Sequence, residues 1–115
     1  MQRGEIRLVD LGTASGAEAA GRRPAVIVSN DGANTSASRL GHGVVTVVPV
    51  TSNVAKVYPF QVLLPGEECG LAHDSKAQAE QVRSIAVERI GTRVGQVSPG
   101  LMMSVDAALR LHLSL

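Results

Sequence analysis

The segment VVTVVPVT, residues Val44–Thr51, carries the strongest signal for the fold, because no other segment is so rich in β-branched side chains. Valine and threonine favour extended backbone, since two heavy atoms on Cβ restrict their rotamers and pack well on a pleated surface. The segment therefore predicts a strand. Pro49 interrupts it, and a proline inside a strand indicates an edge, a bulge or a bend, because it has no N–H to donate.

Working outward from this segment, short apolar stretches alternate with polar ones. We expect further strands over residues 5–11 (EIRLVDL), 24–29 (PAVIVS) and 60–64, one or two over 75–85, and a last one over 93–97. The polar stretches at 12–22 and 30–43 predict loops, the second with one helical turn at most.

The C-terminal part of the chain changes character and predicts a helix. Ser98 and Pro99 are typical of an N-cap followed by proline at the first helical position. An amphipathic stripe follows at four-residue spacing, made of Leu101, Val105, Leu109 and Leu113. Several short strands and one terminal helix predict an α+β, mainly β fold, with a strongly curved sheet or small barrel.

Length and composition exclude several classes of protein. The 115 residues predict one domain, residues 1–115, and the net charge of +1 is too small to indicate a nucleic-acid binder by itself. The single cysteine, Cys69, rules out an intramolecular disulfide and fits a reducing cytoplasm. No stretch approaches the roughly 18 apolar residues of a membrane span. We therefore expect a cytoplasmic protein.

The usual motifs of metal and nucleotide chemistry are missing. No Cys or His pair has zinc-ligand spacing, so no metal or cofactor is expected, and neither a P-loop nor a dinucleotide fingerprint is present. His73, Asp74 and Ser75 are the residue types of a catalytic triad, but adjacent side chains point apart, which favours a loop. Cys69 has no visible base partner and is interpreted as an inert thiol.

Three segments stand out when they are considered together. The first segment contains Gly16-Ala17-Glu18 and Gly21-Arg22-Arg23-Pro24, and it precedes an apolar strand. The second lies at the end of the long strand and consists of residues Val48 to Asn53. The third is Glu80-Gln81-Val82-Arg83-Ser84-Ile85. In this order, and with Arg3-Gly4-Glu5-Ile6 and Tyr58-Pro59-Phe60, they resemble the MazF/PemK (Kid) family of toxin endoribonucleases over nearly the whole chain. The resemblance is strongest to mycobacterial and actinobacterial members.

The resemblance implies a fold, an activity and partners. The fold is a strongly curved antiparallel sheet forming an SH3-like barrel with a C-terminal helix, in a homodimer that binds single-stranded RNA across the two subunits. The activity is a metal-independent, sequence-specific endoribonuclease, the toxin of a type II toxin–antitoxin pair, held in check by a cognate MazE-like antitoxin. Attack of the ribose 2′-hydroxyl on the adjacent phosphate would leave a 2′,3′-cyclic phosphate and a 5′-hydroxyl.

The resemblance also implies the residues of the site. Arg23 matches the catalytic arginine of the family, Thr51 its threonine, and Glu18 the glutamate of its first loop. An arginine fork suits this reaction because it stabilises the extra negative charge on the phosphorus oxygens. A hydroxyl can both donate and accept at the phosphate, and a carboxylate could accept a proton. The expected RNA contacts are Arg22, Ser52, Asn53, Glu80 and Gln81, with Gln81 and Arg83 open to a purely structural role.

The chain departs from the Kid branch of the family at one point. That branch has an arginine where this sequence has Gln78, so its catalytic roles do not transfer there. Two alternatives stay open at this point: a gyrase-directed toxin of the CcdB type, and a non-catalytic SH3-like module that binds RNA or protein. The Arg23-Pro24 and Thr51 matches disfavour the gyrase-directed toxin, because a protein binder needs no phosphate-stabilising pair.

Overall fold

Strand β3 (Val44–Thr51) forms the centre of the sheet in the computed structural model, which describes all 115 residues. It pairs antiparallel with β2 (Arg22–Ile27), with β6 (Arg83–Ala86) through its first half and with β5 (Ser75–Gln78) through its last two residues. Pro49 lies between the part paired with β6 and the part paired with β5. The predicted interruption at this proline is therefore confirmed, as a change of neighbouring strand.

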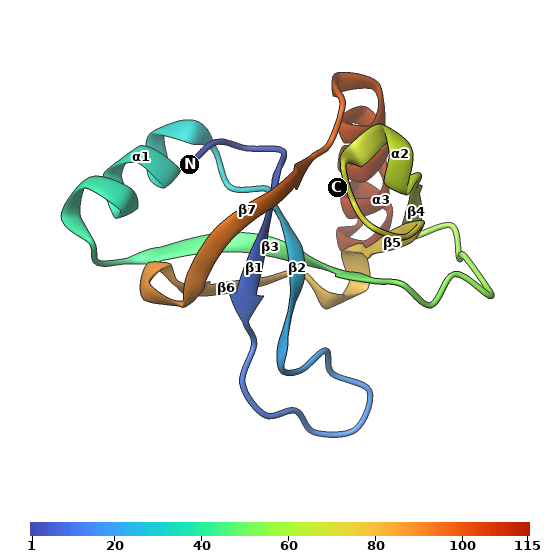
Figure 1. Cartoon of the computed structure of the whole chain (residues 1–115), viewed down its shortest axis with the longest axis horizontal. Coiled ribbons are helices and arrows are strands. Elements are labelled where there is room, and N and C mark those ends of the chain that lie inside the picture. Colours follow the sequence, from blue (N-terminus) through green and yellow to red (C-terminus); the bar gives the residue numbers. More distant parts are fainter.

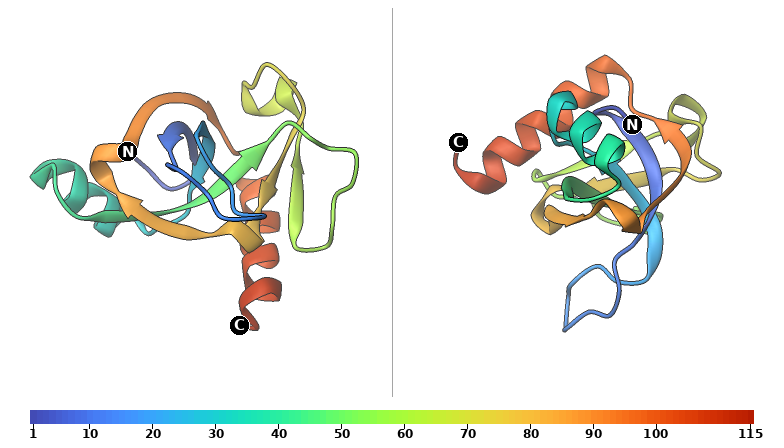
Figure 2. Two further views of the ribbon diagram at one scale, coloured as in Figure 1. Left: turned by 90° about the horizontal axis from the view of Figure 1, so that it is seen from below. Right: turned by 90° about the vertical axis from the view of Figure 1, so that its left-hand side faces the viewer.

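The whole sheet is antiparallel, strongly curved and open (Figures 1 and 2). Its strands run in the order β4 (Gln61–Leu64), β5, β3, β2, β1 (Glu5–Asp10) and β7 (Ile90–Gln96), while β6 pairs with β3 beside this path. The pairing of β1 with β7 shifts register twice, and such irregularities increase the local twist of a strand. The predicted curved sheet is confirmed, but it does not close into a complete barrel.

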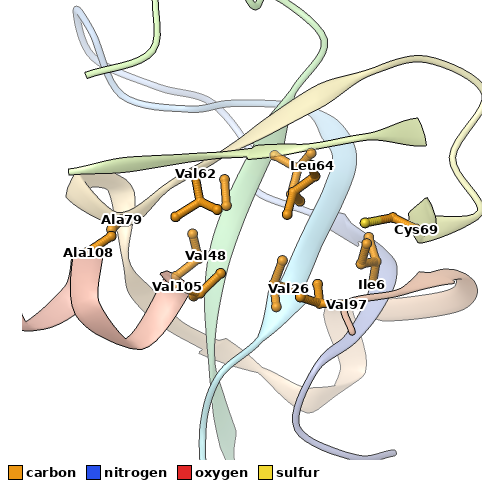
Figure 3. Close-up of a cluster of buried hydrophobic side chains, with 12 residues drawn as sticks. Ile6, Val26, Val48, Val62, Leu64, Cys69, Ala79, Val97, Val105 and Ala108 are labelled. Carbon is orange, nitrogen blue, oxygen red and sulfur yellow. The ribbon is translucent and has the colours of Figure 1, made fainter. Parts of the chain in front are cut away.

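Both faces of the central strands are buried, which explains their continuous apolar runs. Val48 and Val50 belong to one hydrophobic cluster, whereas Val45 and Val47, which point the other way, belong to a second. Figure 3 shows the first cluster, which includes Val105 of the C-terminal helix. A strand covered on one face alone would alternate apolar and polar residues.

The C-terminal helix α3 (Pro99–Leu113) begins as predicted and packs through one stripe. The Ser98 hydroxyl accepts a hydrogen bond from the Leu101 amide, and proline follows the cap. Val105 is fully buried on the predicted stripe, whereas Leu113 at its end is 49% exposed. The first part of the stripe thus packs on the sheet and the last turn projects beyond it.

Helix α1 (Asp31–Leu40) corrects the prediction that residues 30–43 form a loop. Asn30 caps its N-terminus, and Gly41 ends it in the left-handed conformation. Asn34 is fully buried and exchanges hydrogen bonds with Ser29, next to β2. The helix was missed because it lacks an apolar stripe. It is held by its caps and by Asn34, whose partner Ser29 also accepts a hydrogen bond from the Thr46 amide of β3 at 3.1 Å.

The remaining strands lie close to their predicted ranges. β1 and β4 lie within one residue of prediction at each end, and the 75–85 stretch splits into β5 and β6, separated by a 3-10 turn, η1 (Ala79–Gln81). A short helix α2 (Gly66–Cys69) follows β4, and a second 3-10 turn, η2 (Val87–Arg89), precedes β7. None of the helices combines the length and the apolar character that crossing a membrane requires.

Candidate active site

A pocket of about 330 Å³ opens where three segments meet: the start of β2, the end of β3 and the loop between α2 and β5. It brings together four residues that the sequence singled out for RNA chemistry, Arg22, Arg23, Thr51 and Ser52. Its other lining residues are Pro24, Val50, Leu71, Ala72, His73 and Ser75. The two arginines and the two hydroxyls are neighbours here because β2 and β3 are adjacent strands of the sheet.

The arginines of this pocket are not neutralised by any carboxylate of the chain. The two side-chain ion pairs of the structure, Arg3–Asp106 and Arg7–Glu5, involve neither of them. Arg23 is half-buried and Arg22 exposed, and neither guanidinium donates a hydrogen bond to another group of the protein. No aspartate or glutamate lines the pocket. Its donors are therefore available to an anionic ligand, and a guanidinium fork matches a phosphate.

Thr51 is held at the end of β3 with its hydroxyl ready to donate. The Thr51 Oγ1 accepts a hydrogen bond from the Asn53 amide at 3.3 Å, and the Asn53 side chain accepts one from the Ala55 amide at 3.3 Å. The turn after the strand is thus fixed by its own side chains. Because the Thr51 oxygen already accepts a hydrogen bond, its O–H remains free to donate to a ligand in the pocket.

Glu18 lies outside this pocket, in a second hollow. That hollow is lined by Glu18, Ala19, Glu80, Gln81, Val82 and Arg83. The Glu18 carboxylate accepts a hydrogen bond from the Ser15 amide of its own loop at 2.9 Å. The structure therefore brings Arg23 and Thr51 together, and it places Glu18 with Glu80 and Gln81 instead.

Gln81 ties the loop between β1 and β2 to the body of the protein. Its side-chain oxygen accepts from the Ala19 amide at 3.1 Å, and its side-chain nitrogen donates to the Ala17 carbonyl at 2.9 Å. This loop otherwise projects away from the sheet (Figures 1 and 2). Gln81 therefore has a structural role. Its expected contact with RNA stays a prediction.

Glu80 has one occupied and one unoccupied oxygen. Its Oε2 accepts a hydrogen bond from Gln61 Nε2 at 2.7 Å, whereas its Oε1 is buried without a partner. Buried polar atoms are nearly always hydrogen-bonded, so this oxygen has the capacity to accept from a ligand or a second chain.

His73 is the pocket residue whose position sequence reasoning missed. The loop interpretation is confirmed for His73 and Asp74, whereas Ser75 begins β5. Asp74 accepts from the Gly66 amide at 2.9 Å, and the Ser75 hydroxyl donates to the His73 carbonyl at 3.1 Å. Their side chains thus serve the loop and not a triad. No local pattern places His73 beside Arg23, because the two meet only through the fold.

Other candidate chemistry receives no support from the structure. Cys69 is 2% exposed, and burial raises the pKa of its thiol, so it stays protonated and inert, as expected. No group of three or more His, Cys, Asp or Glu side chains is placed to hold a metal ion.

Solved structures share this fold over the entire chain. A mycobacterial endoribonuclease in complex with its cognate antitoxin superposes with a TM-score of 0.80 and 25% identity, covering 100% of this chain and 96% of that one. The MazF of Deinococcus radiodurans superposes with a TM-score of 0.77 at 24% identity, covering 100% and 97%, which bears on the fold alone. The fold and the arginine–threonine pocket together place the chain in the class of toxin endoribonucleases.

The sequence comparisons make this assignment specific. Residues 2–113 match the family model described as PemK-like, MazF-like toxin of type II toxin–antitoxin system, and the chain belongs to that family. It is 62% identical over 115 residues to Endoribonuclease MazF9 of Mycobacterium tuberculosis, covering 100% of this chain and 98% of that protein. It is also 36% identical over 116 residues to Endoribonuclease MazF6 of the same species. The resemblance inferred from the sequence is confirmed, and the two alternatives, a gyrase-directed toxin and a non-catalytic module, are set aside.

Proposed function

We propose that this toxin cleaves single-stranded RNA in the pocket formed by Arg22, Arg23, Thr51 and Ser52, without a metal ion. The observation that carries the proposal is a pair of unpaired guanidiniums beside two hydroxyls in a pocket free of carboxylates. Such a pocket attracts a phosphodiester and repels no part of it. A carboxylate-lined site would instead suit a divalent cation.

In the proposed reaction the ribose 2′-hydroxyl oxygen forms a bond to the adjacent phosphorus while the bond from phosphorus to the 5′-oxygen breaks. The 2′-hydroxyl loses its proton and the departing 5′-oxygen gains one, so the products are a 2′,3′-cyclic phosphate and a 5′-hydroxyl. Arg23 donates paired hydrogen bonds to the phosphorus oxygens, whose negative charge increases in the transition state. Thr51 donates its hydroxyl to the same phosphate, and Arg22 adds positive charge.

The remaining site residues are proposed as contacts that orient the RNA. Ser52 and Asn53 follow Thr51 and offer polar groups beside the scissile phosphate. The second hollow contains the carboxylates of Glu18 and Glu80, which repel phosphate but can accept from the exocyclic amino groups of unpaired bases. We therefore assign base recognition to this hollow, with Gln81 holding its loop in place, and we assign Glu18 no direct part in bond cleavage.

The partners follow from the family and from the charge of the chain. Homodimerisation would join two half-grooves into a longer basic track, which a chain of net charge +1 needs to hold RNA. A MazE-like antitoxin would block that track, as the antitoxin complex of the mycobacterial endoribonuclease suggests. The substrate would be messenger RNA in the cytoplasm, where the buried Cys69 thiol stays reduced.

The test is cleavage of a defined single-stranded RNA by the purified protein in excess chelator, with the ends of the products mapped. We expect full activity in chelator, a cyclic phosphate on one product and a 5′-hydroxyl on the other. Replacing the ribose 5′ of the cut by a 2′-deoxyribose should abolish cleavage at that position. A linear 3′-hydroxyl product, or a dependence on added magnesium, would refute the mechanism.

A further inference from the structure

The proposed pocket stabilises negative charge, but its arginines and hydroxyls cannot accept the 2′-hydroxyl proton. Arginine stays protonated at any physiological pH, and a threonine or serine hydroxyl is too weak a base. Glu18, the carboxylate that the family resemblance offers as a proton acceptor, lies in the other hollow together with Glu80. A proton acceptor must therefore come from the rest of the pocket lining.

His73 is the one pocket residue whose side-chain type accepts and releases protons near neutral pH. His73 is exposed, so its imidazole is open to a ligand, and neither ring nitrogen takes part in a hydrogen bond within the protein; the bond from Ser75 goes to the backbone carbonyl. The two other histidines, His42 and His112, line none of the pockets described for this chain.

The backbone of His73 is fixed although its side chain is exposed. A Cβ added to Gly66 would lie 2.8 Å from the His73 carbonyl carbon, so the loop packs directly on the backbone of α2. The Gly66 amide donates to Asp74, the Gly66 carbonyl accepts from the Leu71 amide at 2.9 Å, and Ser75 donates to the His73 carbonyl. A catalytic side chain needs such a rigid support to keep its distance from the reacting atoms.

We propose that His73 is the general base of the cleavage reaction, an inference that rests on the proposed function of the pocket. Its neutral imidazole takes the proton from the 2′-hydroxyl as the oxygen attacks phosphorus. The departing 5′-oxygen takes a proton from water, and the imidazolium then returns its proton to solvent. Arg23 and Thr51 keep the phosphate in place throughout.

The test compares His73→Gln with the wild type in single-turnover cleavage across the pH range. General base catalysis contributes roughly 100- to 10,000-fold, so we expect at least a 100-fold loss for His73→Gln. The wild-type rate should rise with pH until the base is neutral and then level off, and the variant should lose this limb. Added imidazole should restore part of the activity of His73→Ala, because it can occupy the vacated space.

Two controls separate this role from others. His42→Gln removes an exposed imidazole outside the pocket and should cleave like the wild type, with unchanged thermal stability for both glutamine variants. An RNA with sulfur in place of the 5′-bridging oxygen needs no proton on its leaving group. His73→Gln should remain impaired on this substrate; recovery to the wild-type rate would make His73 a general acid and overturn the proposal.

The activity of His73→Gln tests the role of His73, and the product ends of the wild type test the function of the pocket. If His73→Gln cleaves within threefold of the wild type at every pH while the products still carry a cyclic phosphate, His73 is not the base and the pocket keeps its function. If the wild type yields no cyclic phosphate, the proposed function itself fails. A pH profile that is unchanged in His73→Gln, despite a slower rate, would reduce His73 to a structural residue and also overturn the proposal.

Discussion

Arg23 is half-buried and has no carboxylate partner in the chain. Arg22 and Arg23 line one pocket that contains no carboxylate, and like charges in one pocket repel each other. In the proposed function, a bound phosphate would offset this repulsion, because each guanidinium attracts it. The same reasoning explains why carboxylates are excluded from the pocket and gathered in the other hollow.

At this scale we predict that Arg23→Ala impairs cleavage and leaves stability nearly unchanged. Removing one donor aimed at developing charge costs about 100- to 1,000-fold in rate. Arg23→Lys keeps the charge but loses the planar fork, so it should restore activity only in part. Single-turnover cleavage and thermal melts of the same preparations measure both effects.

Arg39→Ala serves as the matched control for Arg23→Ala. Arg39 is an exposed arginine on α1, at the far end of β3 from the pocket (Figure 1), and its loss should change neither rate nor stability. If Arg23→Ala folds normally and cuts within threefold of the wild type, Arg23 is not the catalytic group.

At the level of elements, the middle of the loop between β1 and β2 is attached to the rest of the protein by the buried Ala19 and by the side chain of Gln81. Gln81, in turn η1, contributes two hydrogen bonds to backbone groups of this loop, at Ala17 and Ala19. The loop is short of other restraints because most of its residues are exposed. A loop of this kind opens locally far more easily than the core of the protein.

We predict that Gln81→Ala loosens this loop without unfolding the protein. Each hydrogen bond contributes about 0.5–1.5 kcal/mol net, so hydrogen exchange of the Ala19 amide should accelerate by roughly tenfold. Gln81→Glu keeps an acceptor for the Ala19 amide but cannot donate to the Ala17 carbonyl. The exchange rate of the Ala19 amide in this variant should therefore lie between those of the wild type and Gln81→Ala.

Gln96→Ala, which removes an exposed glutamine side chain from β7, is the control for the Gln81 variants. It should leave exchange of the Ala19 amide at the wild-type rate. Equal protection of that amide in Gln81→Ala and the wild type would show that the two hydrogen bonds do not hold the loop.

At the scale of the whole molecule, α3 leaves apolar side chains exposed near the C-terminus. Leu111 is 58% exposed and Leu115 is 84% exposed, while the sheet covers Val105 completely. A monomer gains nothing from these leucines in water, whereas a second copy of the chain could cover them. This exposure supports the proposed homodimer independently of the charge argument.

We predict that the free protein is a homodimer at micromolar concentration. Light scattering coupled to size-exclusion chromatography measures the mass, and adding the cognate antitoxin should abolish RNA cleavage. A monomeric mass together with full activity would contradict the prediction. Loss of activity on dilution below the dimer dissociation constant would support the idea that the RNA track spans both subunits.

The sequence predicted most of the strands and the C-terminal helix because their signals are local. The β-branched run at Val44–Thr51 and the Ser98–Pro99 cap act through steric limits and hydrogen bonds within a few residues. The curved sheet also followed from the family resemblance. Helix α1 was missed, since its caps are ordinary polar residues and its Asn34 anchor binds Ser29, which is tied in turn to the Thr46 amide of β3, far along the chain.

For the site, the family resemblance implied both the reaction and the pair proposed for phosphate chemistry, Arg23 and Thr51. Which residues share a pocket follows from the folded chain: His73 lines the same pocket as Arg23, whereas Glu18 lies in a separate hollow with Gln81. The physical reason is the range of the interactions. Strand and cap signals depend on near neighbours along the chain, whereas a pocket depends on which strands pair and how tightly a loop packs on Gly66.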